Sequence, residues 1–215
     1  MIATADEAPF ANLSPDLIVN AVESAGFPSD GRVLALGSYE NRVFQVGVED
    51  ADPVVVKFYR PGRWSDLAIA EEHAFARELA AAEIPVIAPF ELPRGGELGE
   101  GPVPVFGGFR FAVYPRRGGQ WPELGNADDR QWIGRFLGRI HAVGAARRFE
   151  HRTRLSPEAM GRASVEFLLG GDFIADYIAH RYEQVTEELL ELVEARFAGV
   201  GTLRYLRIHG DCHRN

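Results

Sequence analysis

At the beginning of the chain, apolar positions are first spaced as in a short helix and then as in β-strands. Ser14 followed by Pro15 is a helix-start signal, and Gly26 ends the helix that this start predicts. Three segments rich in valine and aromatic residues then have the composition of strands. They are separated by Gly37 and by the stretch 49–53, and they lie at 32–36, 42–48 and 54–59. The pattern predicts one helix and three antiparallel strands.

Helical and strand patterns both occur in the next part of the chain. The alanine-rich segment 65–82 has apolar residues at helical spacing and is followed by Pro85, so we expect a helix there. Segments 103–106 and 109–114 have the pattern of strands. The two glycines between them, at 107–108, suit the positive φ values of a two-residue hairpin turn. The sheet is therefore expected to gain two more strands.

A break in the pattern at 115–125 divides the chain. This stretch holds three glycines, two prolines and two arginines, which favours a connector. Beyond it, apolar residues recur at helical spacing in the segments 131–143, 157–169 and 173–197. Gly134 and Gly138 would let another backbone approach the first of these helices, so we expect it to be buried. The sequence predicts an α+β protein with a sheet-based part at 1–114 and an α-rich part at 126–215.

Composition narrows the classes of partner and compartment. Lys plus Arg total 23 against 31 for Asp plus Glu, and the net charge of -8 offers no long-range attraction for nucleic acid or anionic lipid. No run of about 18 apolar residues is present, so we expect no membrane span. Cys212 is the only cysteine, which excludes an internal disulfide and suits a reducing compartment. We therefore expect a cytoplasmic protein that binds neither nucleic acid nor membrane.

Lys57 is the first candidate for chemistry. It lies on the strand 54–59, on the face opposite to the strand's apolar core positions. A strand lysine can simply extend its ammonium to water. If this face lines a cleft, the ammonium suits the phosphates of a nucleotide and needs a carboxylate to hold its long stem. The helix 65–82 offers Glu71 and Glu72, which lie at equal angles to its apolar stripe, so periodicity does not choose between them.

The loop 36–43 joins the first two strands and contains a single glycine, Gly37. A plain hairpin loop accounts for such a segment without any function. If the loop folds over the cleft, however, its backbone N–H groups and the Ser38 hydroxyl can donate hydrogen bonds to phosphate oxygens.

The motif IHGDCH at 208–213 is the strongest chemical signal. Asp211 follows a glycine on a tight turn beside histidines, which suits a base that orients a hydroxyl for attack on a phosphoryl group. A zinc site is one alternative, but His209, Cys212 and His213 are only three ligands. A Cys212 nucleophile activated by His213 is the other, but adjacent side chains seldom face each other. We therefore favour the catalytic base.

Five motifs together resemble the bacterial stress-response kinase A family, a branch of the phosphotransferases that act on aminoglycosides and choline. They are SYENRV at 38–43, VVKFYRP at 55–61, EEH at 71–73, LGRIH at 137–141 and HGDCH at 209–213. The last two are shared more widely among these phosphotransferases, whereas the first two are specific to the subgroup. The resemblance implies the two-lobed protein-kinase-like fold, with an ATP-binding sheet lobe, a hinge at 115–125 and a helical lobe.

The resemblance also implies roles for particular residues. Ser38 matches a residue that contacts ATP, Lys57 the phosphate-binding lysine, Glu72 its helix partner and Asp211 the catalytic base. The implied cofactors are ATP and Mg²⁺, with adenine near the backbone of 113–115. The implied acceptor is a Ser or Thr hydroxyl of a protein. A small alcohol and a non-catalytic ATP-binding module are the alternatives.

The sequence departs from the family pattern at the residues that bind magnesium. The family's metal-binding asparagine stands five places after the catalytic aspartate, one position beyond Asn215, and a second metal-binding aspartate lies farther downstream. Asn215 stands four places after Asp211 and receives no metal role. The metal ligands are therefore unassigned, and we expect a C-terminally truncated chain that is inactive as it stands.

Overall fold

The computed structural model describes residues 9–119 and 124–212, which fold into a five-stranded sheet with helices before, between and after its strands. The sheet has the order β1-β2-β3-β5-β4, and its paired strands are antiparallel. This architecture confirms the expected α+β fold class. Within the described ranges, no helix is long and apolar enough to cross a membrane.

A helix cap and three strands make up the first part of the fold. Helix α1 (Pro15–Ser24) begins at Ser14, whose side chain accepts a hydrogen bond from the Leu17 backbone N–H at 3.2 Å. The strands that follow are β1 (Ser29–Leu36), β2 (Arg42–Val48) and β3 (Ala51–Phe58). The buried side of α1 packs with the apolar side chains of the sheet, including Val56 and Phe58.

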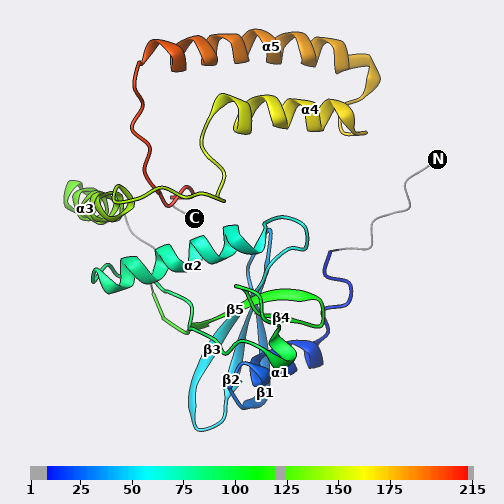
Figure 1. Ribbon diagram of the computed structural model, residues 1–215, viewed down its shortest axis with the longest axis vertical. Coiled ribbons are helices and arrows are strands. Elements are labelled where there is room, and N and C mark those ends of the chain that lie inside the picture. The colour runs from blue at the N-terminus through cyan, green and yellow to red at the C-terminus, as the bar shows by residue number, and fades with distance from the viewer. Residues whose placement is uncertain (1–8, 120–123, 213–215) are drawn as a thin grey trace. The chain divides into compact units, whose positions relative to one another are not determined.

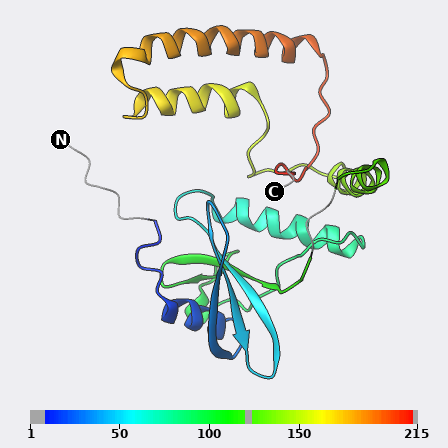
Figure 2. The same ribbon diagram turned by 180° about the vertical axis from the view of Figure 1, so that it is seen from behind.

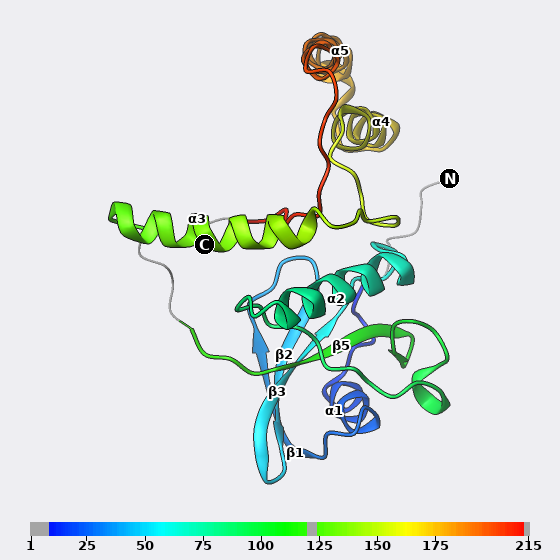
Figure 3. The same ribbon diagram turned by 60° about the vertical axis from the view of Figure 1, so that its left-hand side comes forward.

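The opposite face of the sheet carries α2 (Asp66–Ala81), as the turquoise helix in Figure 1 shows. Buried Ile69 of α2 packs with Tyr59 and Ala112 on this face. Figure 3 shows β5 between α1 and α2. Because strand residues alternate between faces, Lys57 lies on the α2 side while Val56 and Phe58 enter the α1 side.

The hairpin of β4 (Val105–Phe106) and β5 (Phe109–Pro115) closes the sheet. Gly107 and Gly108 have φ values of 55° and 86°, so the expected two-residue turn with positive φ at both positions is confirmed. A short 3-10 turn, η1 (Gly96–Leu98), precedes this hairpin.

Helix α3 (Ala127–Gly144) differs from its expectation. We expected it to be buried, with Gly134 and Gly138 as positions that would let another backbone approach; the burial is wrong, and no backbone of the described residues uses these two positions. Only Ile140 and Gly144 are buried along this helix, and nothing lies within 4 Å of a Cβ built on Gly134 or Gly138. The close approach is made at Gly144, where a Cβ would overlap the carbonyl oxygen of Arg207. The fully buried positions of α3 therefore lie at its C-terminal end.

The chain divides into two compact units, Met1–His151 with Leu206–Asn215, and Arg152–Tyr205. The second unit holds a π-helical turn η2 (Glu158–Arg162), α4 (Ala163–Gly170) and α5 (Asp176–Gly199). Helices α4 and α5 lie side by side (Figure 2). Ion pairs from Arg162 of η2 to Glu187 and Glu194 of α5 connect η2 to α5. The division into lobes at 115–125 stays a prediction.

Candidate functional site

Lys57 lies in the middle of the sheet, with Val43 of β2 and Ala112 of β5 opposite it. Its Nζ lies 3.1 Å from Oε1 of Glu72 and 4.5 Å from the ring centre of Tyr59. The side chain is 23% exposed. The ammonium is therefore fixed by a carboxylate and an aromatic face, which is the geometry of a positioned cation rather than of a lysine that extends into water.

The two neighbouring glutamates of α2 have different partners. The carboxylate of Glu72 pairs with Lys57, whereas the carboxylate of Glu71 accepts hydrogen bonds from the backbone N–H groups of Glu150 at 2.6 Å and His151 at 2.8 Å. Consecutive helix positions are about 100° apart, so one residue faces the sheet and the other faces the segment after α3. The structure thus forms the pair that the family resemblance favoured.

A buried hydrogen-bonded group beside Lys57 was missed by the sequence reasoning. The Tyr59 hydroxyl lies 2.6 Å from Nε2 of His73 and 3.3 Å from the Tyr114 hydroxyl. Burial lowers the pKa of His73 to about 4 and raises the pKa of Tyr114 to about 12. The available signal was position: Tyr59 follows Lys57 on the same strand face, and His73 stands four residues after the buried Ile69.

The loop between β1 and β2 has a defined shape. The Ser38 hydroxyl donates to the Asn41 carbonyl oxygen at 2.9 Å, so the turn is closed within itself. The Asn41 side chain in turn accepts from the backbone N–H of Arg60 at 3.2 Å. Ser38 is exposed, and its hydroxyl oxygen can also accept hydrogen bonds.

Glu40 fixes this loop to the segment after β3. Its carboxylate accepts hydrogen bonds from Nε of Arg63 at 2.9 Å and from Nε1 of Trp64 at 3.3 Å. Partial burial is the largest single influence on the pKa of Glu40 and raises it, but the contacts with Arg63 and Trp64 and the charge of Arg60 together outweigh burial, so the net direction is downward. The loop that carries the SYENRV motif is therefore fastened to the segment just after β3, a side-chain contact that the sequence reasoning did not foresee.

Asp211 lies on an exposed turn made by Gly210, whose φ of 80° favours glycine. The Asp211 backbone N–H donates to Nδ1 of His209 at 3.2 Å. Cys212 is free and exposed. The part of the chain that the structure describes holds no group of three His, Cys, Asp or Glu able to bind a metal ion. Two residues weighed for metal binding, His213 and Asn215, lie outside the described residues.

Comparison with known proteins decides the family. Residues 32–215 match the model of the phosphotransferase enzyme family, APH. The chain belongs to this family. Stress response kinase A of Escherichia coli is 37% identical to this chain over 204 residues, which are 95% of this chain and 60% of the relative. The serine/threonine protein kinase RdoA of Salmonella typhimurium is 36% identical over 205 residues, with the same shares. The chain thus spans 60% of the length of these relatives.

A solved structure shows the fold of this chain independently. The amicoumacin kinase hAmiN, in complex with AMP-PNP, Ca²⁺ and Ami, is similar with a TM-score of 0.59 at 19% sequence identity. The match covers 81% of this chain and 53% of hAmiN. The fold is therefore kinase-like, and the resemblance to the stress-response kinases is confirmed.

Proposed function

We propose that this protein is an ATP-dependent kinase whose acceptor is a serine or threonine hydroxyl of a protein. The observation that carries the proposal is the ion pair of Lys57 and Glu72 between the central strand and α2. A lysine held by a helix carboxylate is the arrangement that a kinase fold uses to place a cation on nucleotide phosphates.

The nucleotide phosphates would lie against Lys57. The ammonium of this residue supplies a compact charge that is already oriented, so little of its side-chain entropy is lost on binding. The Ser38 loop supplies backbone N–H groups and a hydroxyl, and its anchoring through Glu40 to Arg63 reduces the cost of ordering it. We place adenine near the backbone of 113–115.

Asp211 would accept or orient the proton of the acceptor hydroxyl. Its carboxylate is exposed on the Gly210 turn, where an incoming hydroxyl can reach it. Magnesium is implied by the family and would neutralise charge on the β- and γ-phosphates. The described residues form no metal-binding group, so the roles proposed here are those of Lys57, Ser38 and Asp211 alone.

The relatives support a protein as the acceptor over a small alcohol. RdoA, which shares 36% of its aligned residues with this chain, is named a serine/threonine protein kinase. The amicoumacin kinase, whose name points to a small molecule, shares 19%. The greater similarity favours a protein acceptor, and a small alcohol is the second candidate.

An unusual feature of the composition allows a sharp test. Lys57 is the only lysine in the sequence, and every other basic side chain among the 23 is an arginine. An ATP-derived acyl phosphate that acylates lysine amines should label Lys57, and excess ATP should suppress that label. Lys57→Arg, which keeps the charge but cannot be acylated in this way, is the matched control. A label on Lys57 that ATP does not suppress would contradict the proposed nucleotide site.

The acceptor needs a separate assay with the full-length protein. Radiolabelled phosphate from ATP should appear on serine and threonine of a generic protein substrate, and Lys57→Ala should abolish the transfer. Transfer only to members of a panel of small alcohols would replace the protein acceptor by the second candidate.

A further inference from the structure

We infer that Arg207 is a positioning residue for Asp211: its buried guanidinium ties the segment that leads into the catalytic turn to α2, the helix that holds Lys57 through Glu72. The inference rests on the proposed function, because it gives Asp211 the role of the base. It concerns a residue four positions before Asp211 that no sequence motif singled out.

The charge of Arg207 is almost completely buried. The residue is 3% exposed, and its Nη1 donates to Oε2 of Glu78 on α2 at 2.5 Å. Its Nη2 donates to the carbonyl oxygen of Val143 in α3 at 3.1 Å. A buried cation is costly unless it is paired, so these partners restrict the side chain to one position.

Aromatic rings fix the plane of the same guanidinium. It lies 4.3 Å from the ring centre of Phe75 on α2 and 5.7 Å from that of Phe149. The two rings meet edge to face with centroids 5.5 Å apart. Arginine stacks on aromatic faces while its N–H groups bind acceptors, which a lysine ammonium cannot do in the same plane.

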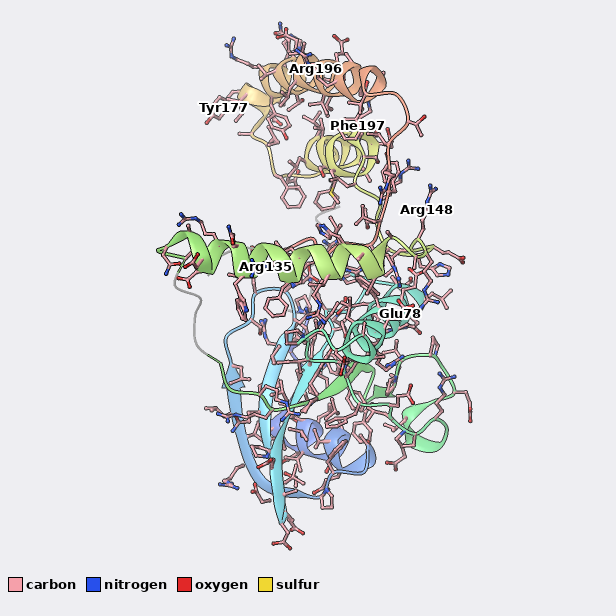
Figure 4. The ribbon with its side chains drawn as sticks, turned by 90° about the vertical axis from the view of Figure 1, so that its left-hand side faces the viewer. Glu78, Arg135, Arg148, Tyr177, Arg196 and Phe197 are labelled. Atoms are coloured by element: carbon pink, nitrogen blue, oxygen red, sulfur yellow. The ribbon has the colours of Figure 1, made fainter. Side chains whose placement is uncertain are left out.

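The backbone of Arg207 is fixed at the end of α3 as well. Its N–H donates to the carbonyl oxygen of Gly144 at 3.2 Å. Gly144 permits this approach because a Cβ there would overlap the Arg207 carbonyl oxygen. Figure 4 shows Glu78 on α2 beneath the C-terminal end of α3. Side chain and backbone together therefore hold Arg207 just before the Asp211 turn.

The same helix thus contacts both halves of the proposed machinery. Glu72 of α2 holds Lys57, and Glu78 of α2 holds Arg207. The Glu78 carboxylate also pairs with Arg147 at 2.6 Å, but that arginine is 58% exposed. Loss of the Arg207 guanidinium should release the catalytic turn while α2 and the Lys57 pair stay in place. Turnover should then fall without an equal loss of ATP affinity.

The test compares Arg207→Met with Arg147→Met in the full-length protein. Arg207→Met should lower kcat about tenfold or more while the dissociation constant for ATP changes less than about threefold. Arg207→Lys should also lose turnover, because an ammonium cannot reproduce the fork of contacts. Arg147→Met removes an exposed partner of the same carboxylate and should keep kcat within about twofold of the wild type.

A stability readout separates positioning from a merely structural role. Adding Glu78→Gln to Arg207→Met removes the carboxylate that has lost its buried partner, so it should restore part of the melting temperature without restoring kcat. Each variant is assayed well below its own melting temperature. If the wild type is active and Arg207→Met keeps the wild-type kcat, this inference alone is overturned. A wild type that transfers phosphate to no acceptor would overturn the proposed function and, with it, the role assigned to Arg207.

Discussion

Acid should destabilise this protein partly through one buried histidine. His73 on α2 is 7% exposed, and its Nε2 lies 2.6 Å from the Tyr59 hydroxyl. Burial is the main cause that lowers its pKa from 6.5 to about 4; the Glu72 carboxylate opposes this, and the charges of Lys57 and Arg77 add to it. The folded protein therefore keeps His73 neutral at pH values where the unfolded chain already protonates it.

The sign and size of the effect follow from proton binding. Between about pH 7 and pH 4 the unfolded state binds more protons at this site, so the free energy of unfolding falls as the pH falls. A pKa depressed from 6.5 to about 4 corresponds to roughly 3 kcal/mol, at about 1.4 kcal/mol per pKa unit. Below pH 4 both states are protonated and the loss from His73 is complete. This loss is large beside a typical domain stability of about 5–15 kcal/mol.

Urea unfolding at pH 7, 5.5 and 4, followed by circular dichroism, measures this loss. His73→Gln keeps a group that can hydrogen-bond to Tyr59 but does not titrate, so its loss between pH 7 and 4 should be smaller than that of the wild type by roughly 3 kcal/mol. His180→Gln, at an exposed position of α5, controls for the loss of a surface histidine. Equal acid-induced losses in the wild type and His73→Gln would refute the reasoning. So would an NMR titration of the wild-type His73 ring with a midpoint near 6.5.

Three further predictions concern the proposed reaction. Asp211→Asn should lower kcat by about 100-fold or more while titrated ATP affinity is kept, because the amide cannot accept a proton; an active variant would remove the assigned base. Glu72→Gln should weaken ATP binding measured by calorimetry several-fold, while its thermal stability changes by less than about 1 kcal/mol because the ion pair is partly exposed; unchanged affinity would mean that Lys57 needs no carboxylate partner. Ser38→Ala should cost about 1 kcal/mol of ATP binding free energy, and no change would make this loop a plain hairpin.

Local signals in the sequence predicted much of the fold. The cap at Ser14 and the turn at Gly107 and Gly108 depend on neighbouring residues only, and both formed as expected. A carboxylate partner for Lys57 was also predictable. A lysine that holds phosphates needs a carboxylate to fix its long stem, and the helix that follows its strand offers two glutamates. The family resemblance then favoured the member of the pair that the structure confirms as its partner, Glu72.

Features that depend on distant residues were not predictable in this way. Glu71 binds backbone N–H groups 79 and 80 residues away, and Arg207 meets Glu78 across 129 residues. Helical periodicity gives a residue's face but not what covers that face. For the same reason the glycines chosen as contact points in α3 were the wrong ones, because only the structure shows that Arg207 approaches α3 at Gly144.

The spacing of the acidic residues on α2 nevertheless holds information that the apolar stripe alone does not. Glu71 and Glu78 are seven residues apart, which is about 20° around a helix, so they share a face with Phe75 between them. In the structure this face engages chain segments that follow α3, including Arg207. Glu72 is about 100° away and faces the sheet. In this structure the two acids in heptad step contact segments that follow α3, and the acid out of step with them, Glu72, pairs with the strand lysine.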